Sequence, residues 1–276
     1  MKTKILMALA VTLATTTSAF AASENVTIQG DHGALAAVVQ RPDGLEQYPM
    51  VILSHGFTAS KEDKIMTNVA NKLEKEGVAS IRFDFNGHGQ SQGLSQDMTV
   101  PNEVSDLKHV YDYASQLPGV KKIGLLGHSQ GGVVSSMTAG ELGSKKIKAL
   151  VLMAPAAVLR EDAIRGNMMG IQYDPLNPPA VIELPMLHNF KVGANYVKEA
   201  QNLQIFPTAA KYKGQALMIH GKADVIAPWS YSERYGQTFK HGQVNYLPTA
   251  DHVFSNPQDM DQATTWAADF LAQNLK

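Results

Sequence analysis

The stretch that decides the fold is Ile123-Gly-Leu-Leu-Gly127-His-Ser129-Gln-Gly131-Gly-Val-Val134. An apolar run breaks at a glycine, presents a single serine, and resumes as a helix that starts with glycines. This is the G-x-S-x-G nucleophile-elbow pattern, in which a serine stands on a sharp turn between a strand and a helix. Glycines are expected at Gly127 and Gly131 because a Cβ atom there would collide with the adjoining strand or helix. A structural turn whose serine only caps the helix is the alternative interpretation.

Composition limits the class of protein. The chain has 276 residues, of which 44% are hydrophobic, and this is enough for one large α/β domain with a buried core. Its formal net charge of -1 argues against a nucleic-acid partner, since proteins that bind the phosphate backbone carry a basic surface. The sequence contains no cysteine, so disulfides, thiolate metal sites and cysteine nucleophiles are excluded.

Residues 1–21 have the pattern of a signal peptide. Two lysines precede an apolar run over residues 5–14, and Ala19-Phe-Ala21 supplies the small residues of a cleavage site. The apolar run is short for a helix that spans a bilayer. We therefore expect cleavage after Ala21 and a secreted or periplasmic mature protein with no stable membrane anchor. An uncleaved anchor is the alternative.

Strand and helix patterns alternate along the rest of the chain. A hairpin is expected over residues 25–40, and further strands at 48–56, 78–85, 123–127, 147–153, 215–220 and 244–247. Apolar residues at helical spacing predict helices over 61–76, 101–116 and 258–275. This alternation is typical of an α/β protein with a mostly parallel central sheet and helices on both faces.

Residues 156–207 interrupt the alternation. Prolines and methionines are frequent there, as in Asp174-Pro-Leu-Asn-Pro-Pro179, and only a short helix near 192–203 is expected. A compact domain rarely contains so long a connection without structure or function. We interpret it as an inserted cap subdomain over the carboxyl ends of the strands, where parallel sheets bind ligands, within a core of residues 22–155 and 208–276. A surface insertion without a role is the alternative.

Two downstream residues complete a candidate catalytic triad with Ser129. Asp224 and His252 each follow a predicted strand, and the chain order serine, acid, histidine is that of a known triad arrangement. His252 would take the proton of the serine during attack, and Asp224 would hold the imidazole in one tautomer. Asp251 is a rival acid, but adjacent side chains on an extended loop tend to point apart.

Two backbone N–H groups are candidates for an oxyanion hole. One is that of Gln130, directly after the nucleophile, and the other is that of Phe57, directly after the strand that ends at 56. Asp84 also stands at a strand end, where we expect it to hold the glycine-rich loop that follows. We expect the four other histidines of strand ends and loops to pack or to support their neighbours, namely His55, His88, His128 and His220. No spacing typical of a metal site is present, so we expect no metal and no cofactor.

Six motifs of the mature chain together fit one family. They are His55-Gly-Phe57, residues 82–93, Gly127-His-Ser-Gln-Gly-Gly-Val-Val134, Ala154-Pro-Ala-Ala157, His220-Gly-Lys-Ala-Asp224 and Ala250-Asp-His-Val-Phe254. In this combination the sequence resembles the bacterial cinnamoyl or feruloyl esterases of the α/β-hydrolase superfamily, over essentially the whole mature chain. The resemblance implies an α/β-hydrolase fold with an inserted cap.

The resemblance also implies a substrate and its binding residues. It implies hydrolysis of feruloyl, coumaroyl or caffeoyl esters through an acyl-enzyme, with the cap holding the aromatic acyl group. Asp162 and Tyr196 match the polar residues that reach the phenolic hydroxyls, while Met169 stands where relatives can carry glutamine. A small-molecule ester is thus the expected partner, and a homodimer is compatible with the sequence.

Other functions stay open from the sequence. A generalist short-chain carboxylesterase or an acylglycerol lipase would use the same triad, although the polar, proline-rich cap weighs against a lipase. Perhydrolase or acyl-transferase activity would also use it. The alternative from a different class is a non-catalytic binding protein, which should have lost at least one triad residue; all three candidates are present.

Overall fold

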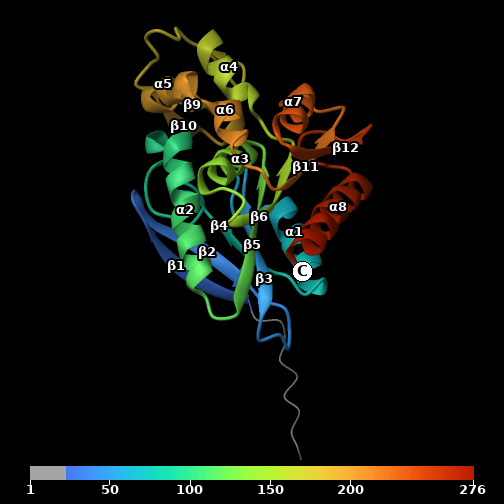
Figure 1. Ribbon diagram of the computed structural model, residues 1–276. Helices are drawn as coiled ribbons and strands as arrows, with labels where there is room; N and C mark the ends of the chain where they lie inside the picture. The colour runs from blue at the N-terminus through green and yellow to red at the C-terminus, as the bar shows by residue number, and fades with distance from the viewer. Residues whose placement is uncertain (1–22) are drawn as a thin grey trace, which may run out of the picture.

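The computed structural model describes residues 23–276, shown in Figure 1. The predicted signal peptide, residues 1–21, lies outside this range. None of the helices within residues 23–276 combines the length and the apolar character needed to cross a bilayer.

An eight-stranded sheet forms the centre of the protein, in the order β1-β2-β4-β3-β5-β6-β11-β12. Its strands are β1 (Ser23–Gly30), β2 (Gly33–Gln40), β3 (Tyr48–Ser54), β4 (Ala79–Phe83), β5 (Val120–His128), β6 (Ile147–Met153), β11 (Gln215–Gly221) and β12 (His241–Leu247). β2 pairs antiparallel with β1 and β4, and all other neighbours pair parallel. The mostly parallel sheet predicted from the sequence is confirmed.

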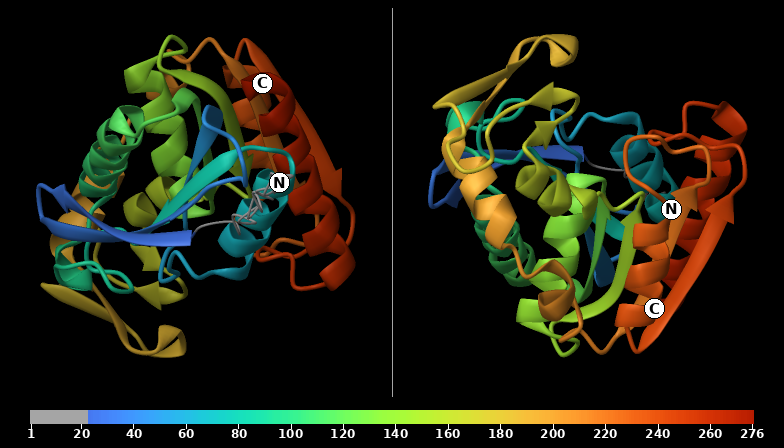
Figure 2. Two further views of the ribbon diagram at one scale, coloured as in Figure 1. Left: turned by 90° about the horizontal axis from the view of Figure 1, so that it is seen from below. Right: turned by 90° about the horizontal axis from the view of Figure 1, so that it is seen from above.

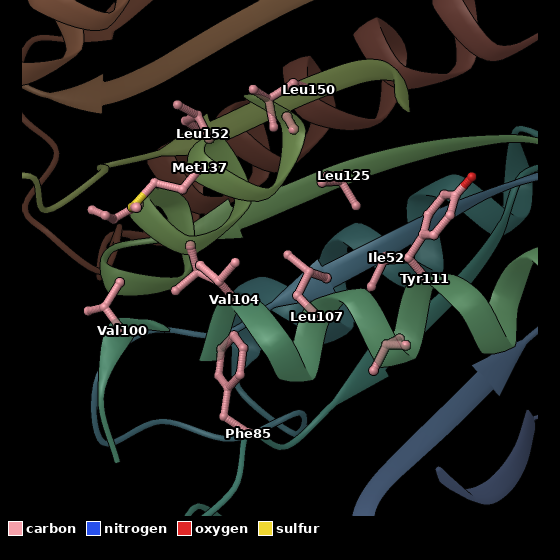
Figure 3. Close-up of a cluster of buried hydrophobic side chains, with 14 of the residues drawn as sticks. Ile52, Phe85, Val100, Val104, Leu107, Tyr111, Leu125, Met137, Leu150 and Leu152 are labelled. Atoms are coloured by element: carbon pink, nitrogen blue, oxygen red, sulfur yellow. The ribbon is translucent and has the colours of Figure 1, made fainter. Parts of the chain in front are cut away.

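Helices cover both faces of this sheet, as the end-on views of Figure 2 show. One face is covered by α1 (Lys64–Lys75) and α8 (Pro257–Leu275), and the other by α2 (Val100–Gln116) and α3 (Gln130–Leu142). The strands alternate between the two layers because successive side chains point to opposite faces. On β3, Val51 joins the buried cluster beneath α1 and α8, whereas Ile52 joins the cluster beneath α2. Figure 3 shows this second cluster, with Leu107 of α2 beside the sheet.

One helix of the core is absent from the sequence prediction. It is α7 (Ser230–Thr238), which lies between β11 and β12. Its sequence SYSERYGQT is mostly polar, and only Ser232 and Tyr235 are buried. So sparse an apolar pattern does not distinguish a short helix from a loop.

The segment of residues 156–207, called the inserted segment below, contains more structure than the sequence predicted. The expected short helix is present as α5 (Ala194–Asn202). The other elements are α4 (Val158–Arg165), the hairpin of β7 (Asn167–Met168) and β8 (Ile171–Gln172), the hairpin of β9 (Val181–Leu184) and β10 (Phe190–Gly193) with the short helix η2 (Pro185–Leu187) between its strands, and the start of α6 (Ile205–Ala209). In Figure 1 the inserted segment lies at the top of the molecule, beyond the carboxyl ends of the parallel strands.

Candidate active site

Ser129 stands on a strained turn between β5 and α3. Its φ of 55° is one that residues with a side chain rarely adopt. The flanking glycines make room for the turn, because a Cβ at Gly127 would collide with the carbonyl oxygen of Gly131, and one at Gly131 would collide with that of His55. The sequence thus forms the nucleophile-elbow geometry that its motif predicted.

The structure brings the three candidate triad residues together. Nε2 of His252 lies 2.9 Å from the Oγ of Ser129, and Nδ1 of His252 lies 2.7 Å from Oδ2 of Asp224. Each residue follows the carboxyl end of a parallel strand, namely β5, β11 and β12. Because the carboxylate accepts from Nδ1–H, the ring presents its unprotonated Nε2 to the serine hydroxyl.

Asp224 is buried but well supplied with hydrogen-bond donors. Oδ1 accepts from the N–H groups of Ile226 (2.8 Å) and Ala227 (2.9 Å), and Oδ2 accepts from His252 and His220. Burial is the largest single influence on the pKa of this carboxyl and would raise it. The hydrogen bonds from His220 and His252, the electrostatic attraction to His252 and the hydrogen bond from the N–H of Ala227 together outweigh burial and hold the pKa below the usual range. The group is therefore a carboxylate at neutral pH.

His220 touches the candidate triad directly, in the supporting role that its position in the sequence predicted. Its Nε2 lies 3.0 Å from Oδ2 of Asp224 and 2.9 Å from the carbonyl oxygen of Ala227, and its Nδ1 lies 2.7 Å from Oγ of Ser232. Both partners of Nε2 are acceptors, so this nitrogen carries the proton and Ser232 donates to Nδ1. The available signal in the sequence was the position of His220 at the end of β11, four residues before Asp224.

Two further buried histidines support loops of the site. Nε2 of His128 lies 2.9 Å from the carbonyl oxygen of His252, and burial lowers the pKa of His128 to about 3. His55 accepts from the N–H of Phe85 at 3.2 Å, and burial likewise lowers its pKa to about 3. Both rings are therefore neutral at neutral pH, and each ties a loop of the site to the core, as expected of supporting residues.

The two candidate oxyanion donors border the serine. Phe57 follows Gly56, where an added Cβ would lie only 3.0 Å from Cβ of Ser129. Gln130 is the first residue of α3, and the first N–H groups of a helix lack partners within it. Within residues 23–276, the backbone N–H groups of Phe57 and Gln130 have no backbone hydrogen-bond partner. Both are free to donate to an oxygen atom beside the serine.

A cavity of about 440 Å³ opens in front of the serine, between the core and the inserted segment. The predicted residues that line it are Phe57, Ser129, Gln130, Asp162, Met169, Tyr196 and His252. Asp162 is partly buried, and burial raises the pKa of its carboxyl. Met169 remains 47% exposed at the mouth, whereas Tyr196 is buried and its hydroxyl donates to Oε1 of Gln130 at 2.6 Å.

The rival acids have other partners. Oδ1 of Asp251 accepts from the N–H of Ser255 at 2.8 Å. Asp84 is buried and accepts from Nζ of Lys61 (2.9 Å) and from the N–H of Gln90 (2.9 Å), so it holds the glycine-rich loop as predicted. Across residues 23–276, no cluster of three or more histidine or carboxylate side chains is arranged to ligate a metal ion.

Known proteins resemble this chain over different lengths. The family described as serine aminopeptidase, S33, matches residues 46–174. A putative esterase/lipase 2 of Mycoplasma pneumoniae is 36% identical over 234 residues, which cover 75% of this chain and 82% of the relative. An uncharacterized 31.7 kDa protein of Escherichia coli is 30% identical over 100 residues, only 35% of its own length.

A solved structure resembles the chain over nearly all of both molecules. It is Est1E from Butyrivibrio proteoclasticus with ferulic acid bound, at a TM-score of 0.85 and 30% sequence identity. The similarity covers 90% of this chain and 98% of Est1E, so it includes the inserted segment as well as the sheet and its helices.

Proposed function

This chain belongs to the esterase family of the α/β hydrolases, and from this premise we propose that it is a serine carboxylesterase that hydrolyses hydroxycinnamate esters. The observation that carries the proposal is the hydrogen-bonded chain of Ser129, His252 and Asp224, which opens into a cavity between core and inserted segment. The hydroxycinnamate preference is supported by the likeness to Est1E, which was solved with ferulic acid bound.

In the first half of the reaction the ester acylates the serine. His252 takes the proton of Ser129 as its Oγ attacks the ester carbonyl, and Asp224 stabilises the imidazolium that forms. The N–H groups of Phe57 and Gln130 donate to the oxyanion of the tetrahedral intermediate. His252 then gives its proton to the departing alkoxide, and the alcohol leaves.

In the second half a water molecule releases the acid. His252 takes a proton from water, the hydroxide attacks the acyl carbonyl, and a second tetrahedral intermediate forms in the same oxyanion hole. Collapse of this intermediate breaks the bond to Oγ of Ser129, which recovers its proton from His252.

The inserted segment would bind the acyl group. Asp162 and Tyr196 offer polar atoms to phenolic hydroxyls in a cavity that is otherwise largely apolar, and Met169 offers a flexible apolar contact at its mouth.

We also propose export, with cleavage after Ala21. Mass spectrometry of the mature protein from the periplasm and medium tests this, and an intact residue 1 in the exported protein would refute cleavage.

The decisive experiment compares two esters. We expect the protein to hydrolyse methyl ferulate with a higher kcat/KM than p-nitrophenyl acetate, and Ser129→Ala to abolish both reactions. Cleavage of the acetate without any cleavage of ferulate would indicate a generalist esterase instead. If a fluorophosphonate fails to label Ser129 in the folded protein, the serine is not an activated nucleophile and a binding role is favoured.

A further inference from the structure

The side chain of Gln130 joins the inserted segment to the core directly beside the nucleophile. Its Oε1 accepts from the hydroxyl of Tyr196 on α5 at 2.6 Å, and its Nε2 donates to Oε2 of Glu103 on α2 at 2.8 Å. Both ends of the amide are therefore engaged, one by each part of the protein. Rotation of the side chain would break both hydrogen bonds.

All three members of this chain of hydrogen bonds are buried. Gln130 is 3% exposed, Glu103 2% and Tyr196 5%. Water competes less for hydrogen bonds between side chains that are almost fully buried, so each hydrogen bond restrains its neighbours more strongly than it would at the surface. Burial also raises the pKa of the Glu103 carboxyl well above its usual range.

The second candidate oxyanion residue is held by the same segment. The ring of Phe57 packs edge-on against Phe190 of β10, with ring centroids 5.2 Å apart. The centroid of the Phe57 ring also lies 6.1 Å from the centroid of the Tyr196 ring. Tyr196 therefore touches both residues whose N–H groups border Ser129.

The inserted segment packs closely against the core where α5 begins. Gly193, at the junction of β10 and α5, lies against the short helix η1 (Ser95–Asp97) so closely that a Cβ would collide with the carbonyl oxygen of Gln96. This contact fixes the start of α5 on the part of the core that leads into α2. The helix that carries Tyr196 therefore begins against the segment that leads into the helix that carries Glu103.

We propose that Tyr196 and Glu103 are positioning residues for the oxyanion hole. They act through Gln130, whose backbone N–H is held in the direction of the developing oxyanion, and Tyr196 also supports Phe57. The inserted segment would then control the rate of acyl transfer for every ester, in addition to the choice of acyl group. This inference rests on the proposed reaction at Ser129, but not on the hydroxycinnamate preference.

The test is Tyr196→Phe assayed with p-nitrophenyl acetate, whose acyl group has only a methyl beyond the carbonyl. Loss of a whole oxyanion donor costs about 100-fold or more in kcat, so a displaced donor should cost about 10-fold, with KM changed by less than about twofold. The same fall is expected with methyl ferulate. If Tyr196→Phe impairs only ferulate hydrolysis, the hydroxyl acts by substrate contact alone and the proposal is wrong.

A matched control lies in the same segment. The hydroxyl of Tyr173 is buried and has no hydrogen-bond partner within residues 23–276. Tyr173→Phe removes an equivalent atom without touching Gln130, so its kcat on the acetate should stay within about twofold of the wild type. An equal fall in both variants would mean that general loosening of the segment, and not the bond to Gln130, is responsible.

Glu103 supplies the second arm of the test. Glu103→Gln keeps an oxygen that can accept from Nε2 of Gln130 and should retain most of the activity, whereas Glu103→Ala should lose about 10-fold in kcat. Rates are expressed per active site titrated with a fluorophosphonate, so that any unfolded fraction is not counted. Equal activity of the Gln and Ala variants would overturn the role of Glu103.

One readout is independent of the substrate. In phosphonylation by a fluorophosphonate, Oγ of Ser129 bonds to phosphorus and fluoride leaves. Negative charge develops on the phosphoryl oxygen in the same oxyanion hole during this step, so Tyr196→Phe should slow it by a similar factor. If the wild type cleaves neither ester but is labelled, the proposed substrate fails while this rate still decides the positioning role. An unchanged labelling rate in Tyr196→Phe would refute that role.

Discussion

Two buried aspartates of this protein have opposite chemistry. Asp224, on the loop after β11, accepts four hydrogen bonds and has a lowered pKa. Asp106, on α2, accepts one from the N–H of Asn86, and its Oδ1 has no partner within residues 23–276. Burial raises the pKa of Asp106 to about 6. Donors, as well as burial, thus decide the pH at which a buried carboxyl becomes charged, and Asp224, where the proposed reaction needs a charge, has the more donors of the two.

Asp224→Asn should have the largest effect. The amide cannot accept all the donors that Asp224 accepts, and its NH₂ group favours the wrong tautomer of His252. We expect kcat to fall by about 10⁴-fold with the fold intact. Hydrolysis of p-nitrophenyl acetate and circular dichroism check the two parts of this prediction. Retention of a tenth of the activity would mean that another group orients His252.

Asp106→Asn should change stability and leave kcat alone. The unfolded chain ionises this carboxyl from about pH 4, but the folded protein does so only near pH 6. The free energy of unfolding of the wild type therefore falls by up to about 3 kcal/mol as pH rises between these values. The asparagine variant, which has no carboxyl to ionise at this position, does not undergo this decrease. Urea unfolding at pH 4 and pH 7 should show the variant gaining relative to the wild type, and parallel behaviour at both pH values would contradict the prediction.

The sequence was informative where a short motif determines geometry. The glycines around Ser129 and the strand ends before Asp224 and His252 are local features, and the structure brings these residues together. Glu103 and Asp106 could not be recognised in the same way, because they occupy polar-looking positions of α2 whose burial depends on residues distant in the chain.

The inserted segment was the least predictable part. Its hairpins β7–β8 and β9–β10 have strands of two to four residues, too short for a periodic pattern. Tyr196 was identified as a substrate residue by resemblance alone. Its bond to Gln130 spans 66 residues of sequence, and no local spacing encodes it.

His220 tests how much the extra donors on Asp224 contribute. His220→Leu removes the N–H that reaches Oδ2, so the carboxylate is less firmly held, and we expect kcat to fall by about 10-fold. His220→Gln can place an amide N–H near the position of Nε2 and should recover much of the loss. The pair is compared by kcat on p-nitrophenyl acetate. Equal losses in both variants would indicate that the ring is needed for packing and not for its donor.

The smallest effect is expected at Asp251, the acid next to His252 in sequence. Its carboxylate accepts from the N–H of Ser255, and this contact lowers its pKa without involving the imidazole. Asp251→Asn keeps an oxygen for that N–H and removes only a charge near the surface, so kcat should change by less than about twofold. In the Asp224→Asn background, adding Asp251→Asn should again change kcat by less than about twofold, because the effects of substitutions at sites that share no partner are additive. A larger loss in the double variant would show that Asp251 can replace Asp224 as the acid, and the distinction between the two carboxyls would then depend on access to the imidazole and not on donors.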